Sequence, residues 1–260
     1  MIEKKTRDIH LSVELDASPE DVFRAVTDGT ELAKWLAPGA RVTAPEGGNK
    51  GKIWISWGEG MSVEHEIDIF EAPKRMRHPS GENGETKAPL YADWSVEARD
   101  GGKATLRLVH SGFSVGADWD DEYEAHARGW KLMLQNLVRY FARHAHEPAV
   151  HIPFMSKVES PHGAIWKTLL GKLGLSAQPK VGDPFRLTAP DGVLTGVVDH
   201  LTETRALALV VREYDDALLR WTLEGKGEST FVYGYVIAYG DQRERAKALL
   251  AAGESAISES

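Results

Sequence analysis

Two histidines, His65 and His110, stand where their side chains could take part in chemistry. Each falls in phase with the apolar residues of an alternating stretch, His65 with Val63 and His110 with Leu108. Because every second side chain of a strand lies on the same face, both histidines are expected on buried faces. Such a pair could serve as general base and acid near neutral pH, or could orient a ligand carbonyl. The more ordinary interpretation is a buried or rim histidine whose ring is satisfied by a backbone partner.

Large aromatic side chains are spread over the same part of the chain. They could line a pocket for a planar or lipid-like ligand, or they could fill a core between a helix and a sheet, and the sequence leaves both interpretations open. Together with the two histidines, the candidate ligand-binding residues are Trp35, Trp57, His65, Trp94, His110, Tyr123 and Trp130. No residue is assigned to catalysis or to a metal, and no cofactor is expected.

Two other groups contain residue types that bind metals. Four acidic residues between Asp118 and Glu122 precede an apolar periodic stretch, where they are typical of a helix's first turn and are stabilised by its dipole. Three histidines between His144 and His151 have a spacing that would allow chelation. They fall in a linker with two nearby prolines, which favours exposure to solvent. Neither group is therefore predicted to hold a metal.

Composition excludes several classes of protein. The chain has 260 residues, no cysteine, 42% hydrophobic residues and a formal net charge of −8, so it should fold and should not bind nucleic acid. Neither a signal peptide nor an apolar run of about 20 residues is present, and a cytoplasmic protein without a membrane partner is expected. There is no glycine-rich phosphate loop, nucleophile elbow or HExxH helix. An enzyme assignment would rest on a pocket alone, and we leave it open while favouring a protein without catalysis.

The elements that must position these residues follow from periodicity. Ser18 and Pro19 are typical of a helix N-terminus, and a second short helix is expected at residues 30–36. The polar, glycine-rich stretch 78–87 is less typical of a strand and is expected to be frayed or looped. A long amphipathic helix follows the last strand at about residues 118–144, with one bulky apolar stripe. The expected strands are residues 7–16, 51–57, 61–70, 90–99 and 103–113.

Such a sheet must curve around the long helix to bury it. The predicted class is α+β, a helix-grip fold in which a curved antiparallel sheet wraps around a long C-terminal helix and leaves a cavity between them. After two prolines near residue 150, the second half repeats this order, with a helix capped at Ser160 and a short final helix from Asp241. Two tandem domains are predicted, residues 1–147 and a diverged second unit at 148–260.

Five segments of the first half also carry a resemblance: ASPEDVFRAVTD, ELAKWL, GKIWISW, TLRLVHSGF and GWKLMLQNLVRYF. In this order and spacing they resemble the START, polyketide-cyclase and birch-pollen-allergen (SRPBCC) superfamily. Within it, they are most similar to the branch homologous to the activator of heat-shock protein 90 ATPase. The resemblance covers about residues 7–145 and implies a helix-grip fold with a concave cavity.

The preferred expectation is a binding module that holds a small hydrophobic or aromatic molecule under the 118–144 helix. This expectation includes a stress-response context. A second expectation is a chaperone-ATPase-regulating interaction protein, whose sensitive site would be a surface patch. A third is a cyclase- or hydrolase-like enzyme that uses His65 or His110. Ligand identity and oligomeric state are left open by the sequence.

Overall fold

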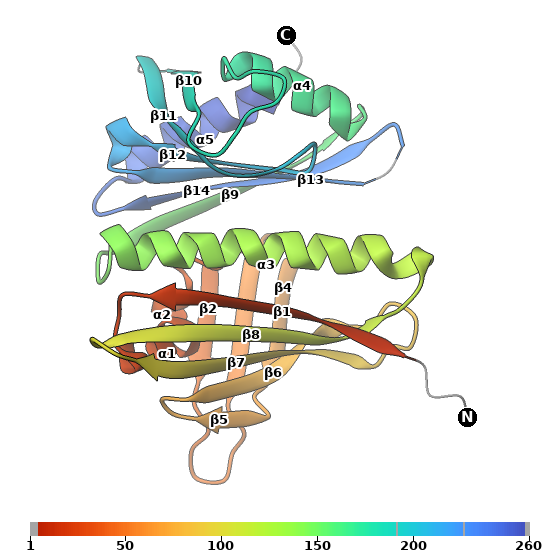
Figure 1. The fold of residues 1–260 in the computed structure, drawn as a ribbon, viewed down its shortest axis with the longest axis vertical. Coiled ribbons are helices and arrows are strands. Elements are labelled where there is room, and N and C mark those ends of the chain that lie inside the picture. The colour runs from red at the N-terminus through yellow and green to blue at the C-terminus, as the bar shows by residue number, and fades with distance from the viewer. Residues whose placement is uncertain (1–4, 191, 226, 258–260) are drawn as a thin grey trace. The chain divides into compact units, whose positions relative to one another are not determined.

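The computed structural model describes residues 5–190, 192–225 and 227–257. The fold is α+β, and the chain divides between Ala145 and His146 into two compact units (Figure 1). The ends of the two predicted domains, residues 1–4 and 258–260, lie outside the described residues. Within the described ranges, no helix is both long enough and apolar enough to cross a membrane.

In its described residues, from residue 5 on, the first unit holds two antiparallel sheets and three helices. A five-stranded sheet has the order β1-β8-β7-β6-β5, and a three-stranded sheet has the order β2-β3-β4. The strand β2 was not expected from the sequence. The elements of this unit are β1 (Thr6–Leu15), α1 (Pro19–Thr27), α2 (Gly29–Leu32), β2 (Gly39–Thr43), β3 (Lys52–Gly58), β4 (Met61–Glu66), β5 (Ile69–Glu71), β6 (Arg75–Glu82), β7 (Pro89–Arg99), β8 (Lys103–Ser114) and α3 (Ala117–Arg143).

The prediction of a single strand at residues 61–70 is wrong, because these residues are divided between two strands. The first part of this range is β4 in the three-stranded sheet, and its last residues begin β5 in the five-stranded sheet. The backbone changes partners between two consecutive residues, since the N–H of Ile67 donates to Gly51 O at 2.8 Å and that of Asp68 to Arg77 O at 2.8 Å. The side-chain alternation continues through this change, and for that reason the pattern alone could not reveal it.

The polar stretch 78–87 is more regular than expected. Its first residues belong to β6, which pairs with β7 and has a register shift between Pro79 and Glu82. Only the remainder is a loop, and Asn83 holds it in place. The side chain of Asn83 donates to Gly112 O at 2.6 Å, and its Oδ1 accepts from the N–H of Thr86 at 3.0 Å.

The starts of the first two helices follow local capping rules. The Ser18 hydroxyl accepts from the N–H of Asp21 at 3.1 Å, and Pro19 is the first helical residue, which confirms the predicted start of α1. The second helix, α2, ends at Leu32, earlier than predicted. Its start is fixed by Asp28, whose carboxylate accepts from the N–H of Thr30 at 2.8 Å.

The long helix predicted from the apolar stripe is confirmed as α3, which packs along β1 and β8 (Figure 1). Asp118 and Asp120 lie in its first turn, as expected from the helix dipole. Its buried residues include Trp130, Leu134 and Leu137. This helix therefore carries the side chains that close the first unit over its sheets.

The second unit repeats the order strand, helix, strands, helix. Its six-stranded antiparallel sheet has the order β10-β11-β12-β13-β14-β9. One prediction fails here: the N-cap position of α4 is Pro161 rather than Ser160, and it makes no side-chain capping bond. The final helix has 15 residues, against 27 in α3. Its elements are β9 (Ala149–Val158), α4 (His162–Lys172), β10 (Pro184–Ala189), β11 (Gly192–Thr202), β12 (Ala206–Val211), η1 (Arg212–Tyr214), β13 (Ala217–Glu224), β14 (Thr230–Tyr239) and α5 (Arg243–Ile257).

Candidate functional site

A cavity of about 190 Å³ lies inside the first unit. It is bounded by α1, the segment after α2, strands of both sheets and the middle of α3, so it lies where the sequence predicts a space between helix and sheet. Most of its lining is apolar. The lining residues are Val26, Leu32, Leu36, Ile53, Ile55, Trp57, Val63, His65, His78, Pro79, Ser80, Trp94, His126 and Trp130.

Two of the three lining tryptophans form one wall. The rings of Trp94 in β7 and Trp130 in α3 meet edge to face, with centroids 5.3 Å apart. Trp35 packs against Trp94 at 6.1 Å and is fully buried, and its Nε1–H donates to Ala25 O at 2.9 Å. Trp35 therefore supports this wall from the core and does not line the cavity.

The orientation of Trp130 depends on a histidine. Its indole Nε1–H donates to Nδ1 of His110 at 2.7 Å. An acceptor role for Nδ1 places the proton of the neutral imidazole on Nε2. Burial, with smaller contributions from His126 and His78, lowers the pKa of His110 to about 3. His110 is thus a neutral residue that holds the tryptophan wall.

The polar end of the cavity is formed by His78 in β6 and His65 in β4, two strands in contact with each other. Nδ1 of His78 lies 2.6 Å from Pro79 O, and because a carbonyl only accepts, Nδ1 carries the proton. Burial lowers the pKa of His78 to about 4. Burial also lowers the pKa of His65, whose Nε2 is buried with no hydrogen-bond partner among the described residues.

Of the seven candidate ligand-binding residues, the structure places Trp57, His65, Trp94 and Trp130 on the cavity wall. Trp35 and His110 lie behind the wall. Tyr123 lies toward the start of α3, where its hydroxyl donates to Asp8 O at 3.2 Å and its ring packs against Phe113. It contacts β1 and β8 instead of the cavity.

Sequence reasoning missed two histidines of the lining, His78 and His126. The sequence nevertheless contains a periodic pattern that places each of these histidines on a buried face. His78 alternates in phase with Met76, which is fully buried, and His126 lies one helical turn before Trp130 on the same stripe. The polar character of the stretch after His78 hid the first pattern.

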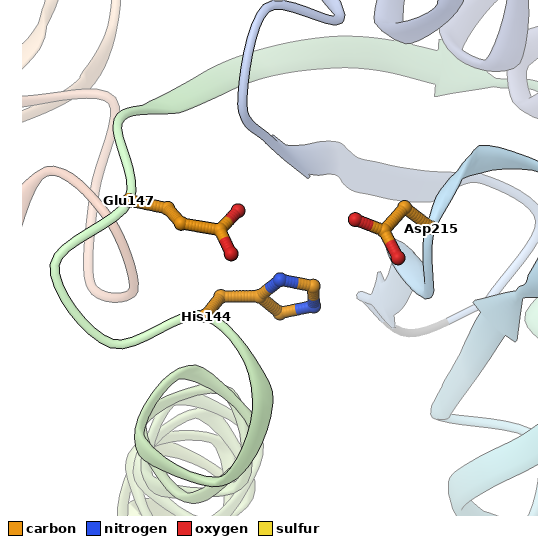
Figure 2. Close-up of side chains that lie close together, drawn as sticks. All are labelled: His144, Glu147 and Asp215. Carbon is orange, nitrogen blue, oxygen red and sulfur yellow. The ribbon is translucent and has the colours of Figure 1, made fainter.

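The linker histidines differ from expectation at two positions. His151 lies in β9, is half-buried and packs its ring against Tyr235 with centroids 5.0 Å apart. His144, predicted to be exposed, is only 3% exposed. It is the C-cap of α3, and its backbone N–H donates to Tyr140 O at 2.8 Å. Figure 2 draws its side chain with those of Glu147 and Asp215. His144 belongs to the first unit, and Glu147 and Asp215 belong to the second. We therefore assign no metal site to these residues.

Comparison with known proteins gives a family match in the first unit. The family described as "Activator of Hsp90 ATPase homolog 1-like protein" matches residues 16–142. No curated protein matches the chain.

Several solved structures are similar to the chain at low identity. The di-domain ARO/CYC BexL from the BE-7585A biosynthetic pathway is 15% identical, with a TM-score of 0.46 over 96% of this chain and 92% of that chain. The Aha1 dimer from Colwellia psychrerythraea is 19% identical, with a TM-score of 0.42 over 52% of this chain and 96% of that chain.

Proposed function

We propose that the first unit is a ligand-binding module of the family described as "Activator of Hsp90 ATPase homolog 1-like protein", whose model matches residues 16–142. Its ligand is a small hydrophobic or aromatic molecule, bound in the cavity beneath α3. The single observation that carries the proposal is the cavity itself, about 190 Å³ in volume and lined by three tryptophans and a majority of apolar residues.

The cavity volume sets the size of the ligand. Apolar cavities of about 150 Å³ in proteins bind benzene. A cavity of about 190 Å³ therefore accepts one aromatic ring with a short substituent. Affinity would come chiefly from apolar burial, at about 25 cal/mol for each Å² removed from water.

Native mass spectrometry of the purified protein, followed by denaturation and extraction, tests the proposal. A retained aromatic compound is the expected result. A titration with toluene, followed by tryptophan fluorescence, tests it independently of what the protein retains. The variant Val63→Trp fills the cavity and should abolish binding. Val115→Trp adds the same side chain at a position that is 52% exposed and should not affect binding. Equal affinity of both variants would overturn the proposal.

The family match supports a second candidate, a regulator of a chaperone ATPase. Its sensitive site would lie on the surface, so Val63→Trp should stimulate a chaperone ATPase as well as the wild type does. An enzyme using the predicted histidine pair has less support. His65 lines the cavity, whereas His110 lies behind it with Nδ1 already occupied by Trp130.

A further inference from the structure

We propose that the cavity selects a single-ring phenol, whose ring lies among the tryptophans and whose hydroxyl donates to Nε2 of His78. This inference rests on the proposed function above and names the ligand class for the same cavity. It is carried by the hydrogen-bonding state of two histidines at the polar end and by the chemistry of the rest of the lining.

His78 presents a fixed acceptor. Its Nδ1–H is committed to Pro79 O at 2.6 Å, so Nε2 carries a lone pair. The residue is only 4% exposed, lines the cavity, and makes no hydrogen bond through Nε2 within the described part of the chain. A ligand that donates a hydrogen bond to this nitrogen gains that bond without breaking one that the described residues make.

His65 offers the complementary group. Its Nε2 is also buried and has no partner among the described residues, and it lies on β4 beside the strand that carries His78. A hydroxyl oxygen both donates and accepts. In the tautomer of His65 that is protonated on Nε2, one phenol hydroxyl can donate to His78 and accept from His65.

The remaining lining argues for a neutral ligand. No Asp, Glu, Lys or Arg stands among the described residues that line the cavity. A carboxylate or an ammonium ion would be buried there without a counter-charge, at a high desolvation cost. A ketone or an ether lacks a donor and would leave Nε2 of His78 unpaired. A phenol is neutral and has a hydrogen-bond donor, and its aromatic ring can pack against the three tryptophans.

Calorimetric titration with 4-methylphenol, toluene and 4-methylbenzoate tests the inference on the whole chain. We expect 4-methylphenol to bind about tenfold more tightly than toluene, as one net hydrogen bond implies, and 4-methylbenzoate to show no binding. His78→Phe should remove the phenol's advantage and leave toluene affinity within about twofold. His10→Phe, at an exposed position of β1, should retain the wild-type preference.

A second measurement on the wild-type protein avoids dependence on a variant that fails to fold. In ¹⁵N spectra of the histidine rings, Nε2 of His78 should have the shift of an unprotonated nitrogen and should move upfield when 4-methylphenol binds. Equal affinity for phenol and toluene, with an unchanged His78 resonance, overturns the inference and leaves the proposed function standing. Absence of binding by both neutral probes overturns the proposed function itself.

Discussion

The indole Nε1–H of Trp130 in α3 donates to Nδ1 of His110 in β8 across 2.7 Å. Because this bond uses the lone pair of Nδ1, it exists only while His110 is neutral at that nitrogen. The same indole forms an edge-to-face contact with Trp94 at 5.3 Å. One wall of the cavity therefore depends on a neutral, fully buried histidine in the sheet.

The variant His110→Phe should lower the free energy of unfolding by about 1–3 kcal/mol, because it leaves a buried indole donor without an acceptor. Chemical denaturation followed by circular dichroism measures this loss. Trp130→Phe alone should also destabilise the protein. The double variant should cost clearly less than the sum of the two, because it removes donor and acceptor together. Additive losses would contradict the coupling. His10→Phe, on the exposed face of β1, is the control.

Stability should fall as the pH falls from about 6.5 toward 4. Burial lowers the pKa of His78 to about 4 and that of His110 to about 3, whereas an unfolded histidine titrates near 6.5. Between these values the unfolded state binds more protons, so their contribution to stability is complete above pH 6.5 and is lost as pH decreases.

Denaturation midpoints measured between pH 7 and pH 4 check this expectation. For His78 the loss is on the order of 3 kcal/mol across the window, since one pKa unit corresponds to about 1.4 kcal/mol. His78→Phe should make the pH profile less steep, because one of the two titrating histidines is gone and only His110 still contributes. A profile of the variant as steep as that of the wild type would be the contrary result.

Much of the fold follows from local patterns, because local rules decide those elements. Ser18 caps α1 as predicted, and the stripe around Trp130 becomes the buried face of α3. The division between β4 and β5 has no local pattern. It results from a change of hydrogen-bonding partner at Ile67 and Asp68, which depends on strands distant in sequence.

The candidate site could be predicted only in part. Periodicity indicates burial, and a buried tryptophan can line a cavity or support its wall. Trp94 and Trp35 contact each other, yet only Trp94 faces the cavity. Nor does a sequence show which ring nitrogen carries a proton. For His78 this is decided by the carbonyl of Pro79, a contact that depends on the backbone geometry at the irregular end of β6.

Two tyrosines of α3 should respond differently to loss of their hydroxyl groups. The Tyr140 hydroxyl donates to Glu31 at 2.7 Å, and Lys34 donates to that hydroxyl at 3.3 Å. Burial by itself would raise the pKa of Glu31, but hydrogen bonds from Lys34 and Tyr140 hold it below its ordinary value. Tyr140→Phe should therefore cost about 1–3 kcal/mol of stability and raise the pKa of Glu31, measurable by NMR.

Tyr123→Phe is the matched control, since its hydroxyl donates to Asp8 O in an exposed setting. It should change stability by less than about 0.5 kcal/mol. Equal losses in the two variants would show that the bond between Tyr140 and Glu31 does not anchor α2 to α3.

Two glycines of the second unit should differ sharply when replaced by alanine. A Cβ atom on Gly196 in β11 would lie 1.8 Å from Val210 O in the neighbouring strand and 2.7 Å from the ring of Phe185. Backbone cannot move aside cheaply there, so Gly196→Ala should cost about 1–3 kcal/mol or more. Gly171 lies near the end of α4, and a Cβ atom there meets nothing within 4 Å.

Gly171→Ala should leave stability unchanged or raise it by up to about 1 kcal/mol, because alanine favours the helix. Thermal unfolding of the two variants beside the wild type gives the comparison. If the two units unfold in separate steps, Gly196→Ala should lower the midpoint temperature of the second unit's step only. The reason is that β11, β12 and Phe185 all belong to the second unit. The contrary result would be equal stability of the Gly196→Ala and Gly171→Ala proteins. It would mean that β11 and β12 can move apart at Gly196 without loss of stability, so that the close packing described at this position would be wrong.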